Sequence, residues 1–497
     1  MSELILAIDQ GTTSSRALIF NRAGQQLGLG QREFKQYYPA NGWVEHDGEE
    51  IWDTTLSSCL AAIDNAGISA SDLACIGISN QRETTLLWDR ETGTPVHRAI
   101  VWQDRRTSRF CEQLKQQGLE QSVQEKTGLV IDPYFSATKL KWLLDNVDGA
   151  RRLAEQGRLA FGTVDSFLLW RFTSGESHVT DATNASRTML FNIHEQCWDQ
   201  ELLSRLEIPS SVLPEIYDSA ADFGHSEASL LGASLPITGV LGDQQAAAFG
   251  QCCFSAGMAK STYGTGCFLL LNTGEELVNS QNRLLSTVAY RLQGRPRFAV
   301  EGSIFMAGAT MQWLRDEMGL IEKASDSEAM ARATAEDLSV YLVPAFTGLG
   351  APYWDASARA AIFGMTRDTG ARELVTAALM AVCYQTRDLV EAIVADGGQL
   401  QKLRVDGGMV KNEFLLQSLA DILACEVHRP VVSETTALGA AYVAGLQAGI
   451  YQSLSQIETN WQLDQSWSPA QPESWRQARY SGWQDAVRRT LSTDQSQ

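Results

Sequence analysis

The segment 4–20, LILAIDQGTTSSRALIF, constrains the fold more than any other part of this chain. An apolar run at 4–8 ends on Asp9, a Gly-Thr-Thr-Ser-Ser turn follows, and a second apolar run occupies 17–20. This pattern predicts a β-hairpin whose strands lie in a hydrophobic core and whose polar turn lies at the edge of a sheet. Gly11 has no side chain, so the backbone of the turn can approach a ligand closely.

The turn of this hairpin carries groups that suit a polyphosphate. Thr12, Thr13 and Ser14 offer hydroxyl donors beside backbone N–H groups, and Arg16 adds a fixed positive charge. Asp9 offers oxygen ligands to a metal ion that accompanies the phosphates. The segment lacks the GxxxxGK[ST] pattern of a Walker A loop. The alternative is a polar turn between two core strands that binds no ligand.

Composition excludes several classes of protein. The 497 residues include 40 Lys and Arg against 59 Asp and Glu, which gives a net charge of −19. A nucleic-acid or anionic-membrane partner requires a basic face, so we expect no such partner. The nine cysteines contain no CxxC pair and are typical of reduced core thiols, which favours a cytoplasmic protein. No apolar run reaches the roughly 18 residues of a membrane span.

Strand and helix patterns alternate along the chain, which predicts an α/β fold. The predicted strands are 4–8, 17–20, 74–79, 84–88, 237–241, 268–271, 298–301, 340–343 and 402–405. The predicted helices are 50–66, 108–117, 136–147, 372–396 and 412–424.

A second segment, KSTYGTGCFLLLN (260–272), repeats the strand–turn–strand plan of the first hairpin. This internal repeat predicts two similar domains that face a shared cleft, with chance similarity as the alternative. We place the domains at 1–250 and 251–450. The remainder, 451–497, is interpreted as an irregular tail that four tryptophans attach to the core, with a disordered end, STDQSQ.

Two polar stretches follow predicted strands and offer groups for a hydroxyl-rich substrate. In NQRETT (80–85), Arg82 donates from a planar guanidinium and Glu83 accepts. Neighbouring residues of an extended chain point to opposite sides, so the pair brackets a substrate only where the loop curls. A solvated pair or a salt-bridged pair is the alternative. In GDQQAA (242–247), Asp243 stands between a strand and a helix, where it can serve as general base or metal-linked group, with a helix N-cap as the alternative.

Two glycine-rich stretches in the second half suit a nucleotide, with ordinary turns as the alternative. In YGTGC (263–267), two glycines flank Thr265, so the backbone can wrap around a phosphate. In DGG (406–408), a strand leads to paired glycines and then to a helix that begins near Asn412. A further stretch, TTALGAAYVAG (435–445), has small residues that let a helix pack closely on a neighbour, and we interpret it as structural.

Taken in order, these motifs resemble the FGGY carbohydrate-kinase family, within the actin-like and hexokinase-like ATPases. The resemblance extends to about residue 450, and it is closest to family members that phosphorylate glycerol. It is carried by the segments DQGTTSSR (9–16), NQRETT (80–85), GLVIDPYFS (128–136), VTDATNASRTMLFNI (179–193), GDQQAA (242–247), TYGTGCF (262–268), FTGLGAPYWD (346–355) and RVDGG (404–408).

The resemblance implies two ribonuclease-H-like domains around a central cleft. It also implies ATP with Mg²⁺ as the phosphoryl donor, glycerol as acceptor, sn-glycerol 3-phosphate and ADP as products of glycerol catabolism, and a homodimer or homotetramer. Asp243 is the implied base, and it faces Mg²⁺ together with Asp9. The implied glycerol-binding residues are Arg82, Glu83, Trp102, Tyr134, Asp243, Gln244 and Phe268. The implied nucleotide-binding residues are Thr12, Thr13, Ser14, Arg16, Thr265, Gly308, Gln312, Gly408 and Asn412.

Two other functions stay open at the level of sequence. One is phosphorylation of a different polyol or sugar by a kinase of the same family. The other is a non-catalytic, ATP-driven switch, which has no use for the set Arg82, Glu83 and Asp243. The segment 226–236, SEASLLGASLP, contains no Lys or Arg, whereas bacterial relatives with an allosteric anion site carry a basic loop in this region. We therefore do not expect sugar-phosphate feedback at this position.

Overall fold

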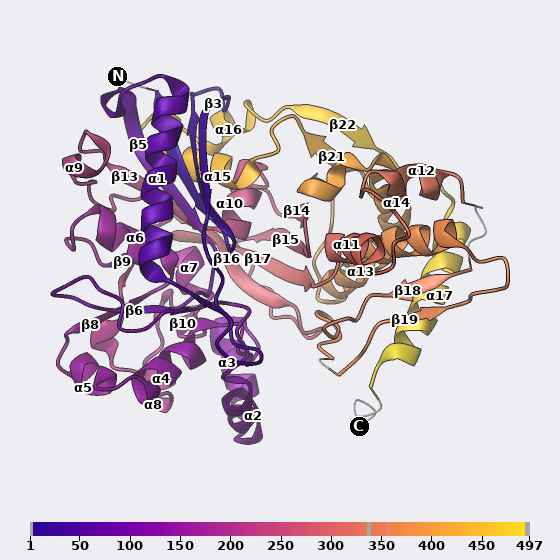
Figure 1. The fold of residues 1–497 in the computed structure, drawn as a ribbon, viewed down its shortest axis with the longest axis horizontal. Coiled ribbons are helices and arrows are strands. Elements are labelled where there is room, and N and C mark those ends of the chain that lie inside the picture. The colour runs from indigo at the N-terminus through magenta and orange to yellow at the C-terminus, as the bar shows by residue number, and fades with distance from the viewer. Residues whose placement is uncertain (1–2, 335–338, 356, 493–497) are drawn as a thin grey trace.

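The computed structural model describes residues 3–334, 339–355 and 357–492. Two central sheets, one in each half of the chain, organise it (Figure 1). The first sheet has the order β13-β5-β1-β2-β3, with bounds Ile237–Gly242, Leu73–Asn80, Leu4–Gln10, Ser14–Phe20 and Gln26–Glu33. The second has the order β16-β17-β15-β14-β20-β21-β22, with bounds Leu285–Leu292, Arg295–Ile304, Cys267–Gly274, Met258–Tyr263, Lys402–Asp406, Val427–Pro430 and Leu463–Trp467.

The two sheets repeat one topology. In the first, the hairpin β1–β2 is antiparallel and β1 also pairs in parallel with β5. In the second, β14–β15 is the antiparallel hairpin and β14 pairs in parallel with β20. The order β3-β2-β1-β5-β13 therefore corresponds to β17-β15-β14-β20-β21, with β16 and β22 added at the edges. The internal repeat seen in the sequence at 260–272 therefore corresponds to β14–β15, the counterpart of β1–β2 in the first sheet.

Helices cover both sheets, and the five helices predicted from sequence are present with ends shifted by at most two residues. These are α1 (Gly48–Ala66), α2 (Ser108–Gln116), α4 (Ser136–Asn146), α13 (Ala371–Ala395) and α14 (Glu413–Leu423). The other helices are α3 (Glu120–Thr127), α5 (Ala150–Glu155), α6 (Val164–Phe172), α7 (Ala182–Ala185), α8 (Gln200–Arg205), α9 (Ala228–Leu231), α10 (Asp243–Gly250), α11 (Gly308–Asp316), α12 (Asp326–Arg332), α15 (Thr435–Gln447), α16 (Leu454–Glu458) and α17 (Glu473–Thr490).

Short strands complete the fold. They are β4 (Glu45–His46), β6 (Leu86–Asp89), β7 (Ala99–Ile100), β8 (Leu159–Gly162), β9 (Val179–Asp181), β10 (Phe191–Asn192), β11 (Cys197–Trp198), β12 (Glu215–Tyr217), β18 (Tyr341–Val343) and β19 (Ala361–Phe363). No helix in the described ranges is both long enough and apolar enough to cross a membrane.

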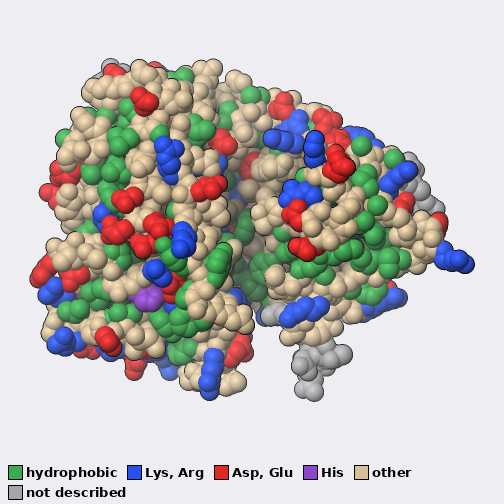
Figure 2. Space-filling model, in the orientation of Figure 1, with side chains coloured by type: hydrophobic (Ala, Val, Ile, Leu, Met, Phe, Trp, Pro, Cys, Tyr) green, Lys and Arg blue, Asp and Glu red, His purple; other side chains and the backbone are tan. Residues whose placement is uncertain are grey.

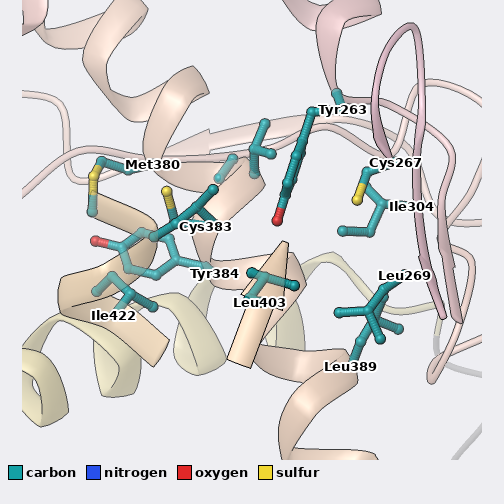
Figure 3. Close-up of a cluster of buried hydrophobic side chains, with 14 of the residues drawn as sticks. Tyr263, Cys267, Leu269, Ile304, Met380, Cys383, Tyr384, Leu389, Leu403 and Ile422 are labelled. Atoms are coloured by element: carbon teal, nitrogen blue, oxygen red, sulfur yellow. The ribbon is translucent and has the colours of Figure 1, made fainter. Parts of the chain in front are cut away.

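The core of the second half forms where α13 and α14 cover the sheet. Figure 3 shows part of this cluster, in which Tyr263 and Leu403 from the strands face Cys383, Tyr384 and other side chains of α13. The hydroxyl of Tyr263 lies 3.2 Å from that of Thr386, so this buried polar atom has a partner. Burial of this surface fixes β14, and with it the second hairpin turn.

The helices α10 and α15 cross at backbone contact. A Cβ atom added at Gly439 would lie 1.8 Å from the carbonyl oxygen of Ala246, and one at Gly250 would lie 2.0 Å from that of Thr435. Although α15 follows β21 of the second sheet, it packs on β1, β5 and β13 of the first. The small residues of 435–445 are therefore structural, as predicted.

The expectation of an irregular tail is wrong. The strand β22 pairs with β21 at the edge of the second sheet, and α17 is an 18-residue helix. Trp467 and Trp483 are buried, and the indole nitrogen of Trp483 donates to Asp388 on α13 at 2.8 Å. The sequence pattern missed α17 because this helix is mostly polar and buries few of its side chains. All but the first residue of the predicted disordered end, 492–497, lie outside the described residues.

Candidate active site between the two sheets

The loop after β5 carries the first polar pair. Glu83 has φ 60°, a left-handed conformation that is uncommon outside glycine, so the loop curls at this residue. Arg82 and Glu83 each have a side chain that is 2% exposed. A solvated pair is therefore excluded, whereas the salt bridge is present, with Nε of Arg82 3.9 Å from Oε1 of Glu83. The Nε atom of Arg82 lies 3.1 Å from Oδ1 of Asp243, which joins two motifs that are 161 residues apart (243 − 82).

Asp243 is the first residue of α10, directly after β13. The N-cap position belongs to Gly242, so the interpretation of Asp243 as an N-cap is wrong. Its side chain is 30% exposed, which leaves the carboxylate accessible to a bound molecule. Burial raises the pKa of the Asp243 carboxyl above its ordinary value, and the positive charges of Arg82 and Lys260 oppose this shift.

Two residues beneath this pair were not identified from sequence. Glu301 on β17 accepts from both terminal nitrogens of Arg82, at 2.5 and 2.9 Å. Arg187 bridges Glu83 at 2.7 Å and Glu301 at 3.2 Å. Burial alone would raise the pKa of Glu301, but the guanidinium groups of Arg187 and Arg82 outweigh it and lower the pKa to about 2. Two signals in the sequence could have identified these residues. Glu301 is a charged residue in an apolar predicted strand, and Arg187 lies within the family motif at 179–193.

Lys260 is the third residue that the sequence analysis missed. It is fully buried on β14, and its amine donates to the side-chain oxygen of Gln244 and to the carbonyl of Phe268, the latter at 3.3 Å. Burial lowers the pKa of Lys260, while Asp406 and Asp243 oppose this shift. The contact fixes Gln244 on α10 against the second sheet.

Three aromatic side chains line the same region. The ring of Trp102 packs edge-on against Tyr134, with centroids 5.7 Å apart, and against Phe268 at 6.4 Å. The indole nitrogen of Trp102 donates to the hydroxyl of Thr12 at 3.0 Å. Trp102 thus links the first hairpin turn to β15, the strand that leaves the second turn. Figure 2 shows a hollow along the line where the two halves meet, with hydrophobic side chains in its depth.

Ion pairs connect the charged residues at the first hairpin turn. Arg16 donates to Asp9 and, at 2.7 Å, to Glu434 at the start of α15. Burial raises the pKa of Asp9, and Arg16 opposes this shift. Thr13 is exposed, and the hydroxyl of Ser14 accepts from Gln31 at 3.2 Å. Thr12, Thr13, Ser14, Arg16 and Asp9 therefore lie on one short hairpin tip, as the sequence predicted.

The second hairpin turn meets the start of α11. The backbone nitrogen of Gly308 donates to the carbonyl of Gly264 at 2.9 Å, and that of Ala309 to Thr265 at 3.0 Å. A Cβ atom at Gly308 would lie 2.5 Å from the Gly264 oxygen, so only glycine permits this approach. Gln312 follows one turn later on α11 and is exposed.

The remaining predicted nucleotide residues lie next to this turn. The Sδ atom of Met409 lies 3.5 Å from the place that a Cβ atom at Gly308 would occupy. The short helix 408–411 is therefore close to the start of α11. Gly408 is exposed, with open space beside its Cα atom. Asn412 caps α14 by accepting from the Leu415 nitrogen at 3.0 Å. Thr265 and Gly408 are thus exposed and Gly308 is half-buried, near the N-terminus of α11.

The arrangement combines two kinds of chemistry. One part offers a carboxylate, a guanidinium and aromatic faces, a set that suits a small molecule with several hydroxyl groups. The other offers two hairpin tips and helix N-termini, which suit phosphate groups. Contacts between the halves, such as Arg82 with Glu301 and Trp102 with Phe268, join the two parts.

Comparisons with known proteins identify the family of this chain. Residues 4–250 match the N-terminal domain and 259–448 the C-terminal domain of the FGGY family of carbohydrate kinases. Glycerol kinase of Ectopseudomonas mendocina is 62% identical over 99% of this chain and 100% of its own length. Glycerol kinase 1 of Pseudomonas aeruginosa is 61% identical, also over 99% of this chain and 100% of its own length.

Solved structures show the same relationship. The crystal structure of Plasmodium falciparum glycerol kinase with ADP has a TM-score of 0.93 and 36% identity, and the match covers 99% of this chain and 98% of that one. Gluconate kinase from Lactobacillus acidophilus has a TM-score of 0.90 at 20% identity over 99% and 98% of the two chains, a likeness in fold alone. This chain belongs to the FGGY family of carbohydrate kinases.

Proposed function

We propose that this chain transfers the γ-phosphoryl group of ATP to glycerol, giving sn-glycerol 3-phosphate and ADP. The observation that carries the proposal is the contact of Arg82 with Asp243 beside Glu83, in a site lined by aromatic rings. The full-length identity to proteins named glycerol kinase supports it. A non-catalytic ATP switch has no need of these residues.

Glycerol has three hydroxyl groups and little apolar surface, so its affinity has to come from charge-assisted hydrogen bonds. Arg82 donates to one hydroxyl, and Glu83, Asp243 and Gln244 accept from the others. Tyr134 adds a hydroxyl of its own. Trp102 and Phe268, which pack on each other, present apolar faces to the carbon chain. This composition favours a short polyol over a longer sugar.

Asp243 is proposed as the base for the reaction. Its partly exposed carboxylate can accept the proton of the attacking hydroxyl as the phosphoryl group is transferred. The Nε atom of Arg82 at 3.1 Å holds this carboxylate in place. Correct positioning supplies much of the rate, and exclusion of water from the cleft limits hydrolysis of ATP.

The two hairpin tips are proposed to hold the nucleotide. Thr12, Thr13, Ser14 and Arg16 lie along the phosphates, and Thr265, Gly308, Gln312, Gly408 and Asn412 line the rest of the nucleotide site. Mg²⁺, when bound, neutralises charge on the phosphates. The donor chemistry fits this ion, because Mg²⁺ is usually held by one or two carboxylates together with phosphates and waters. Asp9 and Asp243 supply the carboxylates.

Removal of the metal gives a direct test of this assignment. Chelation by EDTA is expected to stop ADP formation, and added Mg²⁺ to restore it. Asp9→Asn removes one anionic ligand, so we expect this variant to require at least about tenfold more Mg²⁺ for half-maximal activity. The measurement is a Mg²⁺ titration at saturating glycerol and ATP. An unchanged Mg²⁺ requirement in Asp9→Asn would exclude Asp9 as a ligand.

The substrate is tested by an assay of ADP release with glycerol, xylulose or gluconate as the acceptor. We expect ADP formation with glycerol far above the rate without an acceptor, and little with the two sugar derivatives. Mass spectrometry of the product should show the monophosphate of glycerol. A protein that phosphorylates xylulose or gluconate but not glycerol would contradict the proposal while leaving the family assignment intact.

A further inference from the structure

Glu301 lies at the centre of a buried group of charges below the proposed glycerol site. Its side chain is 0% exposed, and it stands on β17 of the second sheet. Arg82 donates to it through Nη1 and Nη2, at 2.5 and 2.9 Å, and Arg187 through Nη2 at 3.2 Å. Two guanidinium groups of the first half therefore share one carboxylate of the second half.

Glu301 takes up much of the donor capacity of Arg82. The Nη1 atom also donates to Gln245 at 3.3 Å, and Nε faces Asp243 at 3.1 Å. A guanidinium has five N–H groups, so these contacts leave one N–H, on Nη2, for a bound molecule. One N–H suits a hydroxyl oxygen, whereas a carboxylate is bound best by two parallel N–H groups.

Charges of both signs surround the site. Arg82, Arg187 and Lys260 face the carboxylates of Glu83, Asp243 and Glu301, and Lys260 also faces the buried carboxylate of Asp406. Burial opposes ionisation of Glu301, but Arg187 and Arg82 lower its pKa to about 2, so it is charged at neutral pH. Loss of this one negative charge would make the formal charge of the group more positive by one, in a region with little water to screen it.

We propose that Glu301 determines specificity for an uncharged polyol, because it occupies and neutralises Arg82 and Arg187 and so keeps the site from binding three-carbon hydroxy acids. The inference rests on the proposed function and adds a residue that acts from the opposite half of the molecule. Glu301 is a positioning residue, since it acts through Arg82. An anionic analogue of glycerol therefore meets neither a pair of free parallel N–H groups on Arg82 nor a net positive charge.

Inhibition by D-glycerate tests the inference, because this acid carries a carboxylate in place of one CH₂OH group of glycerol. The quantity to measure is the ratio of its inhibition constant to the KM of glycerol. In Glu301→Gln we expect this ratio to fall by about tenfold, and in Arg187→Gln to rise. The double variant Arg187→Gln/Glu301→Gln has the same formal charge as the wild type, so its ratio should return toward the wild-type value.

Two further variants separate charge from structure. Glu301→Asp keeps the charge and loses reach, so it should raise the KM of glycerol and leave the ratio near that of the wild type. Glu45→Gln removes another buried carboxylate, which pairs with Arg106 at 2.8 Å, and should leave the ratio unchanged. Any two folded variants of different formal charge suffice, because the ratio is expected to fall as positive charge is added.

A ratio that does not follow the formal charge of the variants would overturn the inference. In that case an active wild-type enzyme would still support phosphorylation of glycerol. A wild-type protein with no activity on glycerol would instead contradict the proposed function itself. The two failures are therefore distinguishable.

Discussion

Asp243→Asn is expected to lower kcat with glycerol by about 10²- to 10⁴-fold, which is the usual contribution of a general base. The amide has nearly the same shape as the carboxylate but cannot take the proton of the attacking hydroxyl. Arg82 keeps a hydrogen-bond acceptor at this position, so the KM of glycerol should change much less than kcat. Steady-state kinetics with both substrates varied, together with direct measurement of ATP binding, separates the two effects.

A matched control is Asp145→Asn on α4. Asp145 pairs with Lys141 at 3.1 Å and with Arg151, away from the site residues described above. This variant should retain the kcat of the wild-type enzyme. If Asp243→Asn kept a kcat within tenfold of the wild type, Asp243 would be excluded as the base. Normal ATP binding with no turnover is the combination that the proposed role requires.

Gly439→Ala is expected to destabilise the protein by roughly 3 kcal/mol, the upper part of the range for overpacked sites. The added methyl group would lie 1.8 Å from the carbonyl oxygen of Ala246, and the next nearest atoms are also backbone. No side chain can rotate away, so α10 and α15 must separate. Because α10 begins with Asp243, the separation should also lower kcat/KM for glycerol.

The measurement is urea-induced unfolding followed by circular dichroism, with kinetics on the folded protein. Gln447→Ala on the exposed end of α15 is the control, since it adds no volume and leaves the crossing intact. Its unfolding free energy should stay within about 0.5 kcal/mol of the wild type. A Gly439→Ala variant as stable as this control would show that the two helices are free to move apart.

Prediction from the sequence succeeded where an apolar repeat and the residues that end it lie close together in the chain. The hairpin 4–20, the helix 50–66 and the strand 402–405 were predicted because period-2 or period-3.6 apolar runs are bounded by glycine or by caps. The predicted site residues came from motifs that follow such strands. The helix α17 was missed because its burial depends on partners such as Asp388, which lies 95 residues before Trp483.

The sequence by itself determined the two strand–turn–strand units, the α/β class, the family and the polar residues at the tips of the strands. Only the tertiary structure decided that Glu301 of the second sheet holds Arg82 of the first, that Lys260 holds Gln244, and that Gly439 touches Ala246. The physical reason is that hydrophobic periodicity reports which face of an element is buried, and not which distant element buries it. The partner of a buried charge such as Glu301 can be identified only from the arrangement of the two sheets in space.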